Sequence, residues 1–149
     1  MTLVLAPAAA AEIRRHGEAD YPNETCGLMG GRAEGDRYVV TRLVPLRNER
    51  EDSLRNRYLI DPDAFRRAQA ELDHARLDVL GVYHSHPDHP AEPSTFDREH
   101  AWPYLSYVIV GVARGQAGDM RSWRLAEDRS AFAEEPIIME ERHAWPSPS

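Results

Sequence analysis

The stretch VLGVYHSHP, residues 79–87, decides the fold of this chain. Its apolar, partly β-branched residues predict a buried strand, which runs into two histidines and ends at Pro87. Alternate side chains of a strand face the same way, so His84 and His86 should project together while Ser85 points elsewhere. The stretch therefore predicts an interior strand that carries a pair of imidazoles at its exposed end.

A third metal ligand follows within a few residues of this strand. Asp97 is expected about one turn into a short helix, after a proline-rich loop that can return its carboxylate to the histidines. Two imidazoles and one carboxylate leave a bound Zn²⁺ with one net positive charge. The ion then remains a Lewis acid that can lower the pKa of its water to about 7. The pattern predicts a catalytic zinc site with one position open for water.

Hydrolysis also needs a group that moves protons. Glu24 is the best candidate, because it lies just before a short apolar segment, where partial burial would raise its pKa toward neutrality. Ser94 could donate a hydrogen bond to the oxyanion of a tetrahedral intermediate. These residue types together predict a hydrolase.

Each of these residues also has a plainer interpretation. A His-x-His pair on a strand is usually a surface feature, and a glutamate in a turn is usually solvated. Ser94 and Asp97 have the spacing of a helix N-cap with an acidic third residue, which stabilises a helix without any metal. His89 and His100 are rival ligands, and Cys26 is expected to be a small core residue.

The composition limits the class of protein. A length of 149 residues favours one domain, expected over residues 1–142, with a disordered tail at 143–149. The net charge of −7 argues against a nucleic-acid partner, and no apolar stretch approaches the roughly 20 residues of a membrane span. The single cysteine excludes an intramolecular disulfide and fits a cytoplasmic location.

Helical and strand patterns alternate irregularly along the chain, which predicts a mixed α/β or α+β fold with helices packed on a mixed sheet. A charged segment at 46–57 is expected to be a surface loop. The expected strands, besides the one above, are residues 2–6, 26–30, 38–44, 58–60, 105–112, 120–125 and 137–140. Strands 26–30 and 38–44 should form a hairpin, and 137–140 should be an edge strand. The expected helices are residues 8–18, 62–75 with Asp61 as its cap, and 94–102.

The spacing of these motifs resembles a known family. HSHP at 84–87, six intervening residues and STFD at 94–97 look like the JAMM motif of the JAB1/MPN/Mov34 metalloproteases. The upstream YPNETCGLMG, residues 21–30, is similar to the family's segment around its catalytic glutamate. Asn48 and RYLIDP at 57–62 resemble the connecting region of its small bacterial members.

The resemblance implies one zinc ion per chain with a bound water, held by His84, His86 and Asp97. It implies Glu24 as the acid and base, and Ser94 as the residue that stabilises the oxyanion. It also implies a curved mixed sheet flanked by helices, related to the cytidine deaminases. The implied activity is hydrolysis of peptide or isopeptide bonds after the C-terminal Gly-Gly of ubiquitin-like or sulfur-carrier proteins.

Two other functions stay open at this point. Many MPN domains are non-catalytic scaffolds that have lost the metal, although all the ligand types are present here. RadC-like metal hydrolases share the His-x-His-Pro and Ser-x-x-Asp arrangement, usually with asparagine where this chain has Ser85. An amidohydrolase barrel would need about 250 residues, and a zinc deaminase would need a Pro-Cys-x-x-Cys that the sequence lacks.

Overall fold

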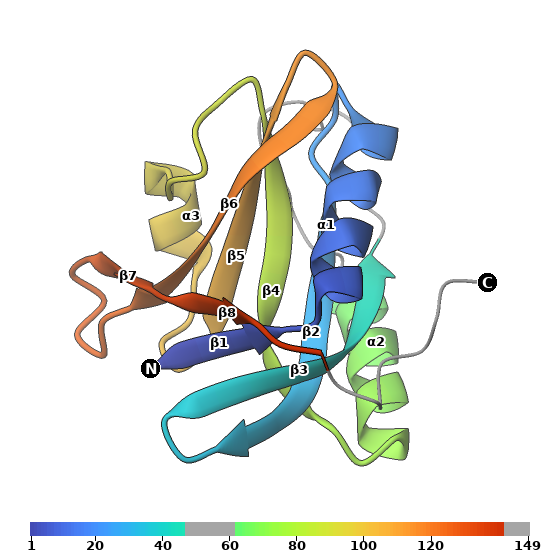
Figure 1. Cartoon of the computed structure of the whole chain (residues 1–149). Coiled ribbons are helices and arrows are strands. Elements are labelled where there is room, and N and C mark those ends of the chain that lie inside the picture. Colours follow the sequence, from blue (N-terminus) through green and yellow to red (C-terminus); the bar gives the residue numbers. More distant parts are fainter. Residues whose placement is uncertain (47–61, 142–149) are drawn as a thin grey trace.

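The computed structural model describes residues 1–46 and 62–141. In this part of the chain, the strands form one mixed sheet in the order β7-β6-β5-β4-β2-β3-β1-β8, with three helices packed on it (Figure 1). The mixed α+β class with a curved sheet is thereby confirmed. The strands are β1 (Thr2–Leu5), β2 (Cys26–Glu34), β3 (Arg37–Leu46), β4 (Asp78–Pro87), β5 (Ser106–Ala113), β6 (Gln116–Leu125), β7 (Phe132–Glu135) and β8 (Ile137–Met139). The helices are α1 (Pro7–Asp20), α2 (Pro62–His74) and α3 (Thr95–His100).

The two edges of the sheet are joined by one residue. β7 and β8 lie at opposite ends of the strand order, yet only Pro136 separates them along the chain. The carbonyl of Pro136 accepts a hydrogen bond of 3.0 Å from the amide of Leu3 in β1. The sheet must therefore curve until its edges nearly meet, as the ribbon shows (Figure 1).

Strand β4 lies inside the sheet and is paired in two different ways. It runs antiparallel to β2 and parallel to β5. A parallel pair needs a long crossover, because the chain must return to the same end of the sheet. Here the crossover contains α3 and the proline-rich loop before it, so the topology brings this loop back to the end of β4.

Alternate side chains of the strands point to opposite faces of the sheet, and each face packs into its own hydrophobic core. On one face, Ile13 of α1 packs with residues that include Tyr83 and Val110. On the other face, Leu72 of α2 packs with residues that include Val82. Figure 1 shows α1 and α3 on opposite sides of strands β4 to β6. Each core therefore covers one set of alternate side chains from the same strands.

The helices begin and pack largely as their sequences predict. Proline stands at the start of α1, and the buried residues Ala64, Ala68 and Leu72 of α2 follow the four-residue spacing of one helix face. The predicted cap of α2, Asp61, lies outside the described residues. No helix within residues 1–46 and 62–141 is long and apolar enough to cross a membrane.

Some predicted boundaries were wrong. The strand that should end at Gly30 continues to Glu34, because a bulge between Gly30 and Gly31 lets the pairing with β3 resume in a shifted register. β6 begins at Gln116 rather than Met120, and β7 was not predicted at all. The missed stretches are largely exposed, so they lack the apolar alternation on which strand prediction depends.

The hairpin of β2 and β3 and the edge strand at Ile137 are confirmed. Several other predictions cannot be compared with the structure. The strand at 58–60, the tail at 143–149 and the charged loop, except for Leu46 at the end of β3, lie outside the described residues. A single domain over 1–142 stays a prediction for the same reason.

Candidate metal centre

The two histidines of β4 lie on one face of the strand, as the alternation of side chains requires. His84 is 0% and His86 6% exposed, and their ring centroids are 5.0 Å apart. Ser85 faces the other way, and its Oγ accepts a hydrogen bond of 2.8 Å from the amide of Thr25. The strand thus buries two imidazoles side by side near its end.

Strand pairing places Glu24 next to these imidazoles. Cys26 pairs with His84 across the antiparallel ladder, and the amide of Ser85 donates to the carbonyl of Thr25 at 3.1 Å. Continuing this register by two residues sets Glu24 opposite His86. Ligand atoms of Glu24, His84 and His86 all lie within 4.8 Å of one another. The sequence places Glu24 far from the motif, and the β2–β4 ladder brings them together.

A helix cap delivers the second carboxylate. The Oγ of Ser94 accepts a hydrogen bond of 3.1 Å from the amide of Asp97, and Asp97 Oδ2 accepts one of 2.8 Å from the amide of Ser94. This capping box holds Asp97 Oδ2 3.1 Å from His86 Nε2 and Asp97 Oδ1 3.8 Å from His84 Nε2. The plain interpretation of Ser94 and Asp97 as a helix cap is therefore right, and the cap also aims the carboxylate at both imidazoles.

The orientation of His86 is fixed by a backbone carbonyl. Its Nδ1 lies 2.9 Å from the oxygen of Pro90, which can only accept a hydrogen bond. Nδ1 therefore carries the proton, and the lone pair of Nε2 faces Asp97 and Glu24. This arrangement of a histidine that bonds a carbonyl on one side is common in metal sites.

The loop that supplies this carbonyl is held by strand β6. The Nε1 atom of Trp123 donates a hydrogen bond of 3.0 Å to the oxygen of Ala91, and Arg121 contacts Glu92 at 3.1 Å. The sequence reasoning missed these residues. A backbone acceptor carries no side-chain signal, and Trp123 in a strand looks like an ordinary packing residue; only the prolines of the loop hint at a fixed conformation.

Burial and nearby charges shift the pKa values of Glu24 and Asp97 in opposite directions. Burial, and after it the charge of Asp97, raises the pKa of Glu24 to about 9. Burial alone would also raise the pKa of Asp97, but the nearby His84, the contact with His86 and the hydrogen bond from the amide of Ser94 outweigh it and hold that pKa well below its ordinary value. Burial lowers the pKa of His84 to about 4, against the smaller opposing effect of Asp97. At neutral pH the centre thus combines neutral His84, an ionised Asp97 and a Glu24 that retains a proton.

These residues fit a divalent cation. Neutral imidazole and ionised carboxylate are the forms in which these side chains bind zinc. Glu24 Oε2 is buried and has no hydrogen-bond partner among the described residues, a cost that a bound ion or its water would remove. The group is therefore compatible with a metal site built on His84, His86 and one or both carboxylates.

The rival histidines do not join this group. His100 stacks on Phe96 with ring centroids 4.0 Å apart, and its Nδ1 lies 2.9 Å from the carbonyl oxygen of Phe96. His89 is exposed and lines the cleft beside the group. Cys26 is fully buried in the core, as expected, and burial is the main reason that its pKa rises to about 12.

An open cleft of about 300 Å³ gives access to the centre. Ser94 lies at the rim of this cleft and is exposed. Because its Oγ accepts the amide of Asp97, its hydroxyl proton remains available for a substrate oxygen. The residues that line the cleft are Glu24, His86, His89, Pro90, Glu92, Pro93 and Ser94.

Comparisons with known proteins agree with this geometry. The family model for prokaryotic homologues of the JAB domain matches residues 6–126 of this chain. A probable TtuB-protein conjugate cleaving protease of Thermus thermophilus is 40% identical over 101 residues, which span 68% of this chain and 64% of that protein. A CysO-cysteine peptidase of Mycobacterium bovis is 29% identical over 130 residues, which span 86% of this chain and 84% of the relative. A solution structure of a Desulfitobacterium hafniense protein superposes with a TM-score of 0.83 at 31% identity, covering 99% of this chain and 100% of the other.

Proposed function

This chain belongs to the prokaryotic homologues of the JAB domain, and from that premise we propose that it is a zinc-dependent peptidase. It would hydrolyse the peptide or isopeptide bond that follows the C-terminal Gly-Gly of a ubiquitin-like or sulfur-carrier protein. The observation that carries the proposal is the buried group of Glu24, His84 and His86 with Asp97 against it, opening into a cleft. The relatives support it, because one is named for cleaving protein conjugates and another for cleaving a carrier–cysteine species.

We propose that His84, His86 and Asp97 are the metal ligands. Asp97 is the carboxylate that stays ionised, and its position is fixed by the helix cap. Zinc held there would polarise the scissile carbonyl and make the attacking water more acidic. His86 keeps its Nε2 lone pair toward the centre because Pro90 holds its Nδ1 proton.

Glu24 is proposed as the proton carrier and not as a ligand. Its ligand atom lies within 4.8 Å of those of both imidazoles, so a cation bound there would favour the ionised carboxylate, which can take a proton from water and release it to the leaving amine. The hydroxyl of Ser94 would donate a hydrogen bond to the oxyanion, since its own lone pair already accepts the amide of Asp97.

The alternatives have less support. A scaffold that has lost the metal would not need two buried imidazoles, an ionised carboxylate and a protonated glutamate around an open cleft, since such a group costs stability without a ligand. A RadC-like hydrolase usually has asparagine where this chain has Ser85, and here the Oγ of Ser85 is used to hold the Glu24 segment. We also propose a cytoplasmic location, which rests on a sequence with a single cysteine that forms no disulfide and is buried.

The test is a trimming assay. CysO and TtuB carriers, each extended by a short peptide beyond Gly-Gly, are incubated with the protein, and the intact mass of the carrier is followed. We expect trimming to Gly-Gly by the zinc-loaded protein, none after chelation, and recovery when zinc is added back. Trimming that survives chelation, or none by the zinc-loaded protein, would contradict the proposed function.

A further inference from the structure

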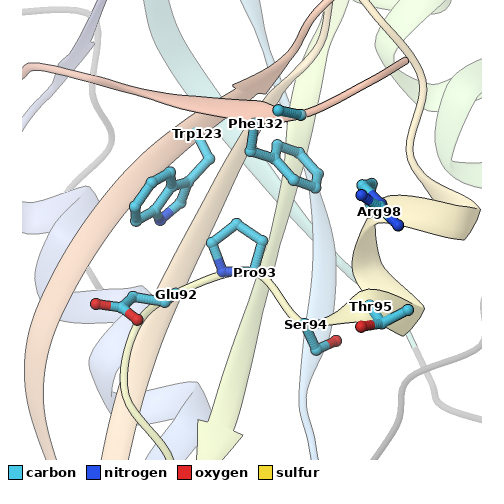
Figure 2. Close-up of a pocket in the computed structure, with 8 residues that line it drawn as sticks. Glu92, Pro93, Ser94, Thr95, Arg98, Trp123 and Phe132 are labelled. Atoms are coloured by element: carbon cyan, nitrogen blue, oxygen red, sulfur yellow. The ribbon is translucent and has the colours of Figure 1, made fainter.

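A second pocket of about 380 Å³ adjoins the metal cleft. The two share Glu92, Pro93 and Ser94, so the pocket begins beside the proposed oxyanion residue. Figure 2 shows it between the loop before α3 and the end of the β6–β7 hairpin. The residues that line it are Glu92, Pro93, Ser94, Thr95, Arg98, Trp123, Ala131 and Phe132.

The walls of this pocket are aromatic and held in place. The rings of Trp123 and Phe132 lie over Pro93 (Figure 2). Trp123 is fixed by its hydrogen bond to the oxygen of Ala91, and Phe132 packs edge-on against Tyr107 at 5.9 Å. Preformed aromatic walls of this kind favour a flat or branched apolar side chain, because little order is lost on binding.

The pocket has one acidic and one basic lining side chain, and they differ in their partners. Glu92 is neutralised by Arg121 at 3.1 Å, and that arginine also holds Glu134 at 2.8 Å. Arg98, at the α3 end, makes one long hydrogen bond of 3.4 Å to the oxygen of Ser130 and no ion pair with the residues that the structure describes. The pocket therefore presents an apolar wall together with a guanidinium that lacks an acidic partner in this part of the chain, which suits an apolar group with a carboxylate.

The carrier side of the scissile bond does not supply such a group. Two glycines precede that bond in the proposed substrate, and neither has a side chain to fill a pocket next to Ser94. The first side chain close to this position belongs to the residue after the bond. When that residue is the last of the chain, its α-carboxylate lies only two bonds from the scissile nitrogen.

We propose that this pocket binds the leaving group, and that it selects a single C-terminal amino acid with an apolar side chain and a free α-carboxylate, which Arg98 binds. This rests on the proposed function of the cleft. It makes a carrier extended by one residue a better substrate than a carrier linked through a lysine side chain of a folded protein, because the linked lysine brings no free carboxylate to Arg98.

The first test compares leaving groups in turnover. The substrates are CysO and TtuB carriers that end in Gly-Gly-Phe with a free carboxylate or with an amide. We expect kcat/KM to be about tenfold higher for the free carboxylate in the wild type. Arg98→Gln should bring the two substrates to similar values, mainly by lowering kcat/KM for the carboxylate. Arg15→Gln, which removes an exposed charge on the opposite face, should keep the wild-type preference.

The second test needs no turnover. Phenylalanine and phenylalaninamide are titrated into ¹⁵N-labelled protein, and the indole resonance of Trp123 is followed, assigned with Trp123→Phe. We expect a shift that saturates at lower concentration with phenylalanine, and loss of this difference in Arg98→Gln.

The outcomes of the two tests separate the two proposals. Binding with this preference, but no trimming of any carrier, would contradict the proposed function and leave the pocket assignment standing. Trimming with equal rates for acid and amide, or equal binding of the two ligands, would overturn the pocket assignment. The assignment would also be overturned if the loss of kcat/KM in Arg98→Gln depended on which residue precedes Gly-Gly in the carrier. That result would place the pocket on the carrier side of the scissile bond.

Discussion

Each face of β4 carries a histidine beside a carboxylate, but the two groups differ in burial and in whether their hydrogen bonds are satisfied. On the α1 face, Tyr83 Oη lies 2.9 Å from His16 Nδ1, and His16 Nε2 lies 3.3 Å from Asp20. On the opposite face, His86 meets Asp97, while Glu24 Oε2 has no partner in the described chain. Both faces place an imidazole beside a carboxylate, half-exposed on the α1 face and buried on the other, and only the α1 group is satisfied by its own side chains.

The difference separates a structural network from a site that needs a ligand. The α1 face has a pocket of about 270 Å³ beside His16 and Tyr83, but each group in the chain from Tyr83 to Asp20 has a partner. The other face opens into a cleft. A buried polar group without a partner costs free energy, so it persists where a ligand supplies what is missing.

The largest effect should come from removing the ligand carboxylate. Asp97→Ala should lose bound zinc and lower kcat/KM by more than about 10³-fold, because two imidazoles alone hold the ion weakly. Asp97→Asn can keep the helix cap and should lose the metal as well. Metal content by mass spectrometry and trimming rate measure both variants. Full zinc occupancy in Asp97→Ala would show that another residue is the third ligand.

Glu24→Gln should separate metal binding from proton transfer. We expect zinc content to stay close to that of the wild type while kcat falls by about 10²–10⁴-fold, since the amide cannot carry the proton. The two quantities are measured on the same protein sample. Loss of zinc in this variant would assign Glu24 as a ligand and would leave Asp97 a supporting role.

Zinc should stabilise the fold through this face alone. At a free zinc concentration about 100-fold above its Kd, we expect roughly 2.7 kcal/mol of added stability, which corresponds to a rise in Tm of about 5–10 °C. Thermal unfolding with zinc and with chelator measures the shift. Asp97→Ala should show almost none; an equal shift in that variant would place the bound zinc elsewhere.

A change in the network of Tyr83, His16 and Asp20 on the α1 face should lower stability and leave activity almost unchanged. Tyr83→Phe should destabilise the protein by about 1 kcal/mol, because His16 Nδ1 loses its partner, and should leave zinc content and kcat/KM within about twofold of the wild type. Urea unfolding and the trimming assay provide the two readouts. A large fall in activity without loss of stability would connect the two faces of β4.

The smallest effect is a pH dependence of the α1 face. Burial lowers the pKa of His16 from 6.5, against a smaller opposing effect of Asp20. The unfolded chain therefore binds this proton more readily, so stability falls as the pH drops below about 6.5. In chelated protein, His16→Gln should show a shallower fall than the wild type, measured by urea unfolding at several pH values. Equal slopes for the two proteins would contradict the shift.

Three components of the proposed site, His84, His86 and Asp97, could be predicted from sequence because their placement follows from local geometry. The two-residue period of a strand places His84 beside His86, and the spacing of a helix cap places Asp97 at its third position. Glu24 was chosen by chemistry and by family resemblance, and the β2–β4 register explains how it reaches the histidines. Its contact depends on pairing between distant segments, which no local pattern contains.

The surroundings of the site could not be predicted in this way. The Pro90 carbonyl that orients His86 belongs to the backbone, and the Trp123 indole that holds the loop comes from a strand far along the chain. Both contacts depend on where the crossover returns to the sheet. The full strand order could not be predicted for the same reason, because only tertiary packing defines it. The same holds for β7, which helps to line the second pocket.

The Pro136 connection also has a consequence for synthesis on the ribosome. β1 leaves the ribosome long before one of its two partners, β8, because most of the described chain separates the two strands. Until that segment is translated, one edge of β1 stays unpaired, and the nascent sheet cannot complete its curvature. The contacts between β1 and β8 should therefore form only after β8 has emerged, and the chain should depend on chaperones more before that point than after it.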